Sequence, residues 1–285
     1  MKELDLQPIH EILSAAGIHW NLYYAESVDS TNDWAKRTAD GIYDPVSIEG
    51  RSVLPRPEEQ ADRDMVSVFL ADHQTAGKGR KGNVWKSPEF TSVSMSILLY
   101  PDIPAERFAL LTLVMGLAAC QGFREVSGLD IRIKWPNDIV FSGRKMSGIL
   151  TEMGPAANYV VIGIGLNVNI PDFPEQLKEK ATSLFMECGK KFKREEVTAE
   201  VLKKFGSCLA RFLAKGNLSD LLEDYRSLLI NRGKRVRVLD PGGAFTGTAV
   251  DVDENGRLLV RSDETEEIIP VSAGEVSVRG IYGYV

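Results

Sequence analysis

The sequence contains few cysteines and few histidines. Its three cysteines, Cys120, Cys188 and Cys208, are odd in number and scattered along the chain. We therefore expect neither a disulfide framework nor a cysteine-based zinc site. The histidines lack the spacing of metal ligands, so a structural role is expected for each of them. They are His10, His19 and His73.

Long hydrophobic runs and an excess of positive charge are also lacking. The longest apolar stretch, Phe108 to Cys120, is shorter than the roughly 20 residues that cross a bilayer. The N-terminus reads MKELDLQPIHEIL, without the basic end and apolar core of a secretory signal. The net charge of −6 argues against a nucleic-acid binder that depends on bulk electrostatics. We expect a cytoplasmic protein with no membrane and no nucleic-acid partner.

The order of strand and helix patterns predicts two domains in the 285 residues. Up to residue 230, strands and helices interleave without a strict βαβ repeat, which predicts an α/β (α+β) domain with a mixed sheet. From Asn231 onward the chain reads as short strands, separated by turns that include Asn255-Gly256. We predict a catalytic domain over residues 1–230 and a small β-barrel over residues 231–285.

Several local patterns predict individual elements. Ser30, with an acid three residues later, is typical of a helix N-cap. Residues 40–63 contain three prolines and many charges, which predicts an exposed loop. Pro104 opens what reads as the longest helical pattern, apolar on most faces and so expected in the core.

A basic, glycine-rich segment from Gln74 to Lys86 is the most informative part of the chain. It contains Gly77, Gly79 and Gly82 and no acidic residue. Glycines allow close approach of the backbone, so such a loop offers N–H groups and cations to phosphates or carboxylates. A dinucleotide-binding loop is excluded because no helix pattern follows, and a Walker loop because no Lys-Ser or Lys-Thr follows the last glycine. A solvated basic surface loop is the alternative.

Two further segments carry polar residues at the ends of predicted strands. In Lys134-Trp135-Pro136-Asn137-Asp138, the last two side chains suit a nucleotide or a metal ion carried by its phosphates. Lys145 is expected on a turn between two strands. A plain hairpin with turn-forming residues is the alternative. Residues 163–169, GIGLNVN, read as a glycine-bearing strand end of the kind that approaches a ligand closely.

Taken together, four segments resemble the biotin–protein ligase family. They are ESVDSTND, QTAGKGRKGNVW, KWPNDIVFSGRKMSGIL and GIGLNVN. The resemblance implies a catalytic domain similar to class II aminoacyl-tRNA synthetases and an SH3-like C-terminal barrel. It also implies activation of biotin with ATP to biotinoyl-5'-AMP, with Mg²⁺ as the metal and no tightly bound prosthetic group. The activated biotin would then pass to a lysine of a biotin carboxyl carrier protein of acetyl-CoA carboxylase or a related carboxylase.

The resemblance also implies roles for individual residues. Arg80 and Lys145 would be catalytic. The residues implied to bind biotin are Ser30, Thr31, Asn32, Gln74, Gly77, Lys78, Gly79, Arg80, Lys145 and Gly148. Those implied to bind ATP are Arg80, Asn83, Trp85, Lys134, Asn137, Asp138 and Asn167, with Asp138 also a metal ligand. Lys78 and Asn83 depart from the family, which often has arginine at both positions, and neither can make the bidentate phosphate contact of an arginine.

The resemblance begins at residue 26, so we expect no N-terminal DNA-binding domain of the kind that some members carry; a homodimer is compatible with it. Two other functions stay open. A lipoate–protein ligase or octanoyl transferase would share the fold, but is expected to lack the glycine-rich basic loop and the Lys-Trp-Pro-Asn-Asp segment. A non-catalytic biotin-binding protein would release no AMP.

Overall fold

Eight strands form the larger of two sheets in the computed structural model, which describes residues 3–42, 48–53, 66–86, 88–239, 243–273 and 277–280. The strands are β1 Asn21–Val28, β2 Ile48–Val53, β3 Ser67–Gln74, β4 Val93–Leu99, β5 Arg132–Lys134, β6 Asp138–Phe141, β7 Arg144–Met153 and β8 Val160–Leu166. Their order in the sheet is β2-β1-β3-β4-β8-β7-β6-β5. β1 and β3 are parallel and the other pairs are antiparallel, so the sheet is mixed, as predicted.

Five strands near the C-terminus form a separate antiparallel sheet, in the order β12-β11-β10-β9-β13. They are β9 Arg235–Leu239, β10 Phe245–Val252, β11 Leu258–Ser262, β12 Ile268–Val271 and β13 Ser277–Gly280. Asn255-Gly256 lies in the turn between β10 and β11, with Gly256 at a φ of +73° that glycine adopts readily. The small all-β unit that the sequence predicts is therefore present.

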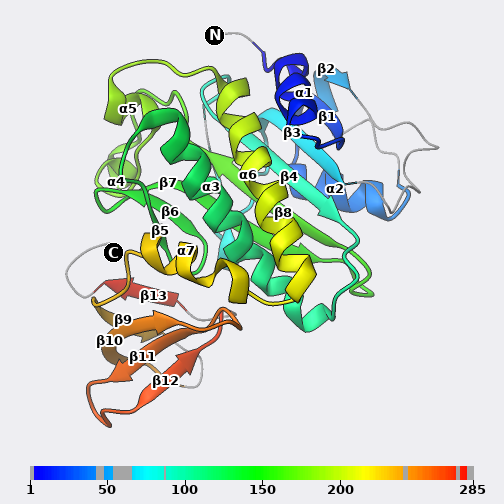
Figure 1. Ribbon diagram of the computed structural model, residues 1–285. Coiled ribbons are helices and arrows are strands. Elements are labelled where there is room, and N and C mark those ends of the chain that lie inside the picture. The colour runs from blue at the N-terminus through cyan, green and yellow to red at the C-terminus, as the bar shows by residue number, and fades with distance from the viewer. Residues whose placement is uncertain are drawn as a thin grey trace.

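Helices flank both faces of the large sheet, as Figure 1 shows. The α-helices are α1 Leu6–Ala15, α2 Thr31–Ala39, α3 Leu111–Ser127, α4 Glu175–Lys178, α5 Leu184–Cys188, α6 Arg194–Lys215 and α7 Leu222–Leu228. Short 3₁₀ turns are η3 Arg80–Gly82, η4 Ala105–Leu110 and η5 Ser219–Leu221. α3 and α6 pack on each other and cover one face, with the main core beneath them.

The strands alternate between this core and the opposite face. In β4, Met95 and Ile97 join the core under α3, whereas Ser94 and Ser96 point to the other side. On that other side α2 lies over the middle strands β3, β4 and β8, where Trp34 packs against Phe69 with ring centroids 5.0 Å apart. The opposite face is thus partly apolar under α2 and polar beside it, and the polar part is where a ligand could lie.

The two sheets contact each other through Trp135, which follows β5 directly. Its indole Nε1 donates to Gly256 O at 3.0 Å, and its backbone N donates to Asn231 Oδ1 at 2.8 Å. Trp135 is fully buried, so both hydrogen bonds are shielded from water. The small sheet is therefore fixed beside β5 and the residues that follow it (Figure 1).

One helical segment in the described part of the chain is long and apolar enough to cross a membrane. It runs from Ala105 to Ser127, 23 residues, and 72% of its most apolar window is buried inside the protein. This helix is longer than the apolar run of residues 108–120 because it also includes charged residues at both ends, among them Glu106, Arg107 and Arg124. The segment is apolar because it lies in the core against α6.

Three expectations about secondary structure need correction. Residues 40–63 contain a strand, β2, which pairs antiparallel with β1; residues 43–47 and 54–65 lie outside the described residues. The segment after Pro104 is helical over 23 residues, but its first six form the 3₁₀ turn η4 and only the remaining 17 form the α-helix α3. Asp138 begins an additional strand, β6, and Lys145 lies in β7 rather than on the turn, which is formed by Ser142-Gly143 at positive φ.

Candidate functional site

The site begins where the parallel strands β1 and β3 end side by side. Val28 and Gln74 are partners in the register of this pair. Because the strands run in the same direction, the segments that follow them also meet: Thr75 N donates to Val28 O at 2.9 Å and Ala76 N to Asp29 O at 2.8 Å. Ser30 then caps α2, its hydroxyl accepting from Asp33 N at 3.4 Å. The Ser-Thr-Asn segment and the glycine-rich segment are thereby brought together.

Gln74 and Thr31 are held by a hydrogen-bond network at this junction. Gln74 Oε1 accepts from Thr31 N at 2.8 Å and from Thr31 Oγ1 at 3.1 Å, and its Nε2 donates to Ser94 Oγ at 3.1 Å. Ser96 Oγ lies 2.8 Å from Thr31 Oγ1. The two serines are the polar face of β4, so the sheet itself orients the Gln74 amide.

Asn32 forms the buried wall beside this network. Its Nδ2 donates to Glu152 Oε2 at 2.6 Å and to Leu150 O at 3.3 Å, and its Oδ1 accepts from Ser96 Oγ at 2.6 Å. The side chain is rigidly held, because both ends of its amide have partners inside the protein. It rests on β8 at Gly163, where no side chain would fit.

The glycine-rich segment folds back on itself as a short, hydrogen-bonded turn. Trp85 N donates to Gly77 O at 2.9 Å, and Gly79 N donates to Asn83 O at 2.7 Å. A Cβ at Gly77 would lie 2.5 Å from Trp85 O, so glycine is required for this closure. Asn83 Nδ2 donates to Arg80 O at 2.8 Å. Within the residues that the structure describes, no long helix directly follows this segment, in contrast to a dinucleotide-binding loop, which agrees with the exclusion of that loop from the sequence.

Arg80 and Lys145 approach the same place from two different elements. Arg80 Nη1 donates to Asn137 Oδ1 at 2.8 Å, and Lys145 Nζ lies 2.5 Å from Asp138 Oδ1. Burial lowers the pKa of Arg80, and the charge of Asp138 opposes that effect. An arginine stays charged at neutral pH even so. The Asn-Asp pair therefore positions both cations.

Lys134 lies behind these groups and is almost completely buried. Burial lowers its pKa to about 8, the carboxylate of Asp138 opposes this shift, and Lys145 and Arg279 add to it. Arg279 belongs to β13, so the small sheet contributes to the electrostatic field near the site.

Two adjoining cavities are lined by these residues. The first is lined by Ser30, Thr31, Asn32, Gln74, Lys78, Gly79, Arg80, Trp85, Asn137, Lys145, Gly148, Ile149, Leu150, Gly163, Ile164 and Gly165. The second is lined by Gly79, Arg80, Lys81, Asn83, Val84, Trp85, Lys86, Asn137, Asp138, Lys145, Asn167, Phe173, Leu177, Lys180 and Ala181. Gly79, Arg80, Trp85, Asn137 and Lys145 belong to both, so the two cavities meet at two cations.

Trp85 narrows the first cavity. Its ring lies against Gly165 and Gly148, and Lys145 Nζ is 5.6 Å from the ring centroid. The cavity has a volume of about 40 Å³, whereas the second has about 390 Å³. Since one water needs about 10–15 Å³ by this measure, a ligand larger than a few waters would have to displace the ring. The buried Trp85 Nε1 has no hydrogen-bond partner among the described residues.

Nearly all the residues predicted from the sequence lie around these cavities. The first cavity contains every predicted biotin-binding residue except Gly77, which lies in the turn behind it. The second contains every predicted ATP-binding residue except Lys134. Proximity alone does not test the individual roles, which stay predictions.

Some cavity residues were missed by the sequence analysis. In the second cavity these are Phe173, Leu177, Lys180 and Ala181, whose segment has no motif and is placed by pairing with β7. In the first cavity they include Ile149 and Leu150 of β7. Ser94 and Ser96 line neither cavity, but they orient Gln74 and Asn32 beside the first, and the alternation of VSMSILL could have indicated that they share a face.

The oxygen ligands available for a metal are few. No group of three or more histidine, cysteine or acidic side chains that could hold a metal ion occurs in the described part of the chain. Asp138 offers one carboxylate at the second cavity. This donor set fits Mg²⁺ only where phosphate oxygens complete its shell, which is how Mg²⁺ commonly binds with nucleotides.

Replacing Gly163 with alanine is expected to damage the wall of the first cavity. The new Cβ would overlap Asn32 Oδ1, and overpacking of this kind costs about 1–3 kcal/mol of unfolding free energy. Urea unfolding of Gly163→Ala measures this loss. Gly116→Ala is the control, because the nearest atom to its Cβ would be 3.7 Å away; equal stability of the two variants would contradict the tight packing on Asn32.

Comparison with known proteins agrees with this geometry. Residues 55–169 match the Biotin/lipoate A/B protein ligase family, and residues 233–279 match the Biotin protein ligase C terminal domain. The chain is 41% identical over 205 residues to "Bifunctional ligase/repressor BirA" of Bacillus subtilis, covering 70% of this chain but only 62% of that relative. It is 35% identical over 230 residues to "Biotin--[acetyl-CoA-carboxylase] ligase" of Mycobacterium tuberculosis, covering 79% of this chain and 83% of that relative.

A solved structure is similar over almost its whole length. It is the biotin protein ligase from Aquifex aeolicus in complex with biotin and ATP, with a TM-score of 0.73, 30% identity, and coverage of 91% of this chain and 99% of that one. Both domain matches, the identity to the Mycobacterium relative and the shared fold lead to one conclusion. The chain belongs to the biotin protein ligase family.

Proposed function

We propose that the protein activates biotin with ATP and transfers it to a specific lysine of a biotin carboxyl carrier protein. The observation that carries this proposal is that the two cavities meet at Arg80 and Lys145. An acid in one cavity and a nucleotide in the other would bring two anions together, and two fixed cations at the junction reduce their repulsion. The relatives named as biotin ligases, and the Aquifex structure with biotin and ATP, support this choice of substrates.

In the first step, a carboxylate oxygen of biotin attacks the α-phosphorus of ATP. The bond from that phosphorus to the pyrophosphate oxygen breaks, which gives biotinoyl-5'-AMP and pyrophosphate. Arg80 and Lys145 stabilise the negative charge that develops on the phosphate and carboxyl oxygens. The described residues form a site for orientation and charge stabilisation, and the reaction needs no covalent nucleophile of the protein.

The first cavity is the proposed biotin site. Ser30, Thr31 and Gln74 would hold the polar ring, with Asn32 as the wall. Gly77, Lys78 and Gly79 form the turn that closes over the acid, and Gly148 packs beside Lys145. Because the hydroxyl and amide groups are already oriented by β4, these groups need little further ordering when biotin binds, whereas the Trp85 ring has to move to admit it.

The second cavity is the proposed ATP site. Asn83, Trp85, Asn137 and Asn167 would contact the nucleotide, while Lys134 acts through its charge from behind. We assign Asp138 as a protein ligand of Mg²⁺ that arrives with the phosphates, where the ion neutralises phosphate charge when bound.

In the second step, the amine of the carrier lysine attacks the acyl carbon of the mixed anhydride. The amine loses a proton and AMP leaves. The relative named Biotin--[acetyl-CoA-carboxylase] ligase supports a carrier of acetyl-CoA carboxylase or a related carboxylase as the acceptor. We also propose a catalytic domain over residues 1–230, an SH3-like domain over residues 231–285 and a cytoplasmic location.

The proposal is tested by incubating the purified protein with ATP and Mg²⁺ and following pyrophosphate release with biotin or with lipoate in parallel. Release with biotin alone is the expected result. Release with lipoate alone would favour a lipoate ligase, which the matched Biotin/lipoate A/B protein ligase family also includes. No release with either acid, together with measurable biotin binding, would favour the non-catalytic binding protein.

A further inference from the structure

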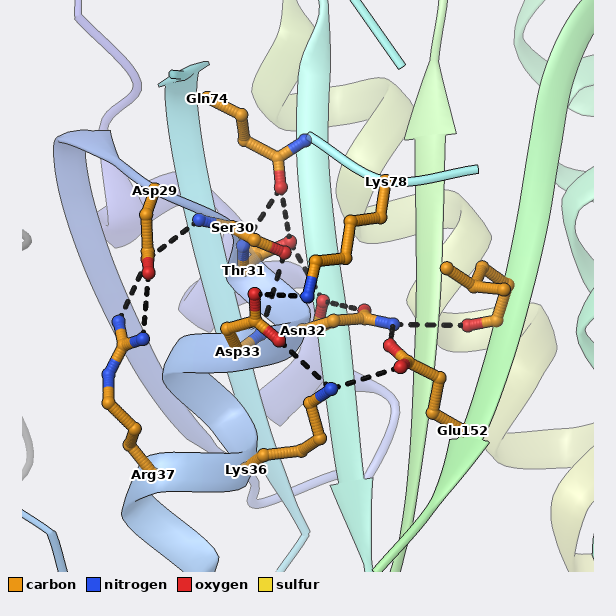
Figure 2. Close-up of polar contacts among 12 residues, drawn as sticks. Asp29, Ser30, Thr31, Asn32, Asp33, Lys36, Arg37, Gln74, Lys78 and Glu152 are labelled. Atoms are coloured by element: carbon orange, nitrogen blue, oxygen red, sulfur yellow. Dashed lines mark hydrogen bonds and ion pairs between the residues drawn. The ribbon is translucent and has the colours of Figure 1, made fainter. Parts of the chain in front are cut away.

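Three charged side chains behind the first cavity connect two residues that line it. Lys78 Nζ lies 2.6 Å from Asp33 Oδ2, and Asp33 Oδ1 lies 2.9 Å from Lys36 Nζ. Lys36 Nζ also lies 2.9 Å from Glu152 Oε1, and Glu152 Oε2 accepts from Asn32 Nδ2 at 2.6 Å. Figure 2 shows this chain of alternating charges running from the turn, through α2, to the Asn32 wall. Lys78 and Asn32 line the first cavity, whereas the three residues between them do not.

Asp33 is the centre of this chain because it contacts a cation on each side. Burial would raise its pKa, but the hydrogen bonds from Lys78 and Lys36 outweigh this and hold the pKa below its ordinary value. Its carboxylate is therefore ionised at neutral pH. Within the described part of the chain, no other acidic side chain lies within ion-pair distance of Lys78.

The ion pair of Lys78 with Asp33 restricts the conformations of the flexible lysine side chain. A lysine ammonium sits on a flexible four-carbon stem, and holding that stem in one conformation costs conformational entropy. An ammonium has three N–H donors. One contact with Asp33 fixes the group at the cavity and leaves two donors for an anionic ligand, so α2 supplies an orientation that the stem lacks.

We infer that Asp33 is a positioning residue for biotin activation, which holds Lys78 of the glycine-rich turn over the first cavity. This inference rests on the proposed function. In this role α2 holds the glycine-rich turn at the first cavity. The same contacts continue through Lys36 and Glu152 to Asn32 in the wall of that cavity.

A double-mutant cycle in the pyrophosphate assay tests the coupling. Asp33→Asn is expected to raise the KM for biotin about twofold to fivefold with little change in kcat, which is the size of one partly exposed ion pair. Lys78→Gln should raise it at least as much. In the double variant, Asp33→Asn should add nothing, because its effect passes through Lys78. An unreduced effect of Asp33→Asn in the Lys78→Gln background would overturn the inference.

Arg37→Gln is the matched control for the helix. It removes a different ion pair of α2, in which Arg37 Nη1 lies 2.7 Å from Asp29 Oδ2, and Arg37 lines neither cavity. Arg37→Gln is expected to lower the thermal stability about as much as Asp33→Asn does, but to leave the KM for biotin unchanged. If Arg37→Gln raised the KM as much as Asp33→Asn, the effect would belong to α2 stability rather than to Lys78.

Hydrogen exchange without substrates tests separately from catalysis whether the contact of Asp33 with Lys78, here called the tether, holds the glycine-rich turn. Peptides covering residues 77–86 should exchange faster in Asp33→Asn than in the wild type, and equally fast in Arg37→Gln. Should Asp33→Asn fold poorly, Lys78→Gln must give the same faster exchange. Failure of the wild type to release pyrophosphate would refute the proposed function alone, whereas unchanged exchange in both variants would refute the tether.

Discussion

Arg80→Ala is expected to slow biotin-dependent pyrophosphate release by roughly ten- to a hundredfold or more. A charged hydrogen bond contributes about 1.5–3 kcal/mol, and each 1.36 kcal/mol of barrier is a factor of ten in rate. Arg80 lines both cavities, and Asn137 holds its guanidinium at 2.8 Å, so the charge is in place before the substrates meet. The loss should appear mainly in kcat if the contact strengthens in the transition state.

Lys145→Ala is expected to give a loss of the same order, since Lys145 is the second cation shared by the cavities. It also removes the ion pair in which Lys145 Nζ lies 2.5 Å from Asp138 Oδ1. Steady-state pyrophosphate release at saturating ATP measures both variants. Arg132→Ala is the control, because Arg132 lies on β5 of the same sheet, pairs with Asp130 and lines neither cavity. Near wild-type rates for Arg80→Ala and Lys145→Ala would contradict the assignment of the junction as the reaction centre.

The parts of the fold that were predictable are those with a local physical signal. The Ser30 cap, α1, the buried strand β3 and the five short strands after Asn231 each follow from capping, alternation or turn residues within a few positions. β2 and β6 were missed for the opposite reason. β2 lies among prolines and charges, and β6 is only four residues long, so pairing with β1 and β7 places them rather than their own sequence.

The candidate site was predictable to the extent that its residues fall in motifs. Each motif lies at a strand end or turn, and the sheet order brings these ends together in a way that no single segment encodes. The orientation of the Gln74 amide could not be predicted from its own segment, because it depends on the register of β1 with β3 and on the serines of β4. The ion pair of Lys78 with Asp33 and the contact of Glu152 with Asn32 join distant segments, so only the folded chain reveals them.

A buried hydrogen-bond network around Asp72, two residues before Gln74 in β3, supports the strand that carries Gln74. Asp72 is in β3, and its Oδ2 accepts from Tyr24 Oη at 2.6 Å and from Leu4 N at 3.1 Å. Its Oδ1 pairs with Arg194 at the start of α6. Burial, and then the hydrogen bond to Asp72, raise the pKa of Tyr24, so the tyrosine stays neutral and donates a hydrogen bond to that carboxylate. One carboxylate thus joins the N-terminal segment, β1, β3 and α6.

Arg194→Met is expected to lower the unfolding free energy by about 3–5 kcal/mol. Arg194 and Asp72 are both almost completely buried, and removing one partner leaves a charge in the interior without its counter-ion. Urea unfolding of the full chain measures the loss. Arg211→Met is the control: Arg211 pairs with Asp224 at 2.8 Å, but both side chains are more than two-fifths exposed, so a loss below about 1 kcal/mol is expected. If Arg194→Met lowered the unfolding free energy no more than Arg211→Met, the Asp72 network would not be what stabilises β3. The Gln74 amide would then depend on its contacts with Thr31 and Ser94 alone.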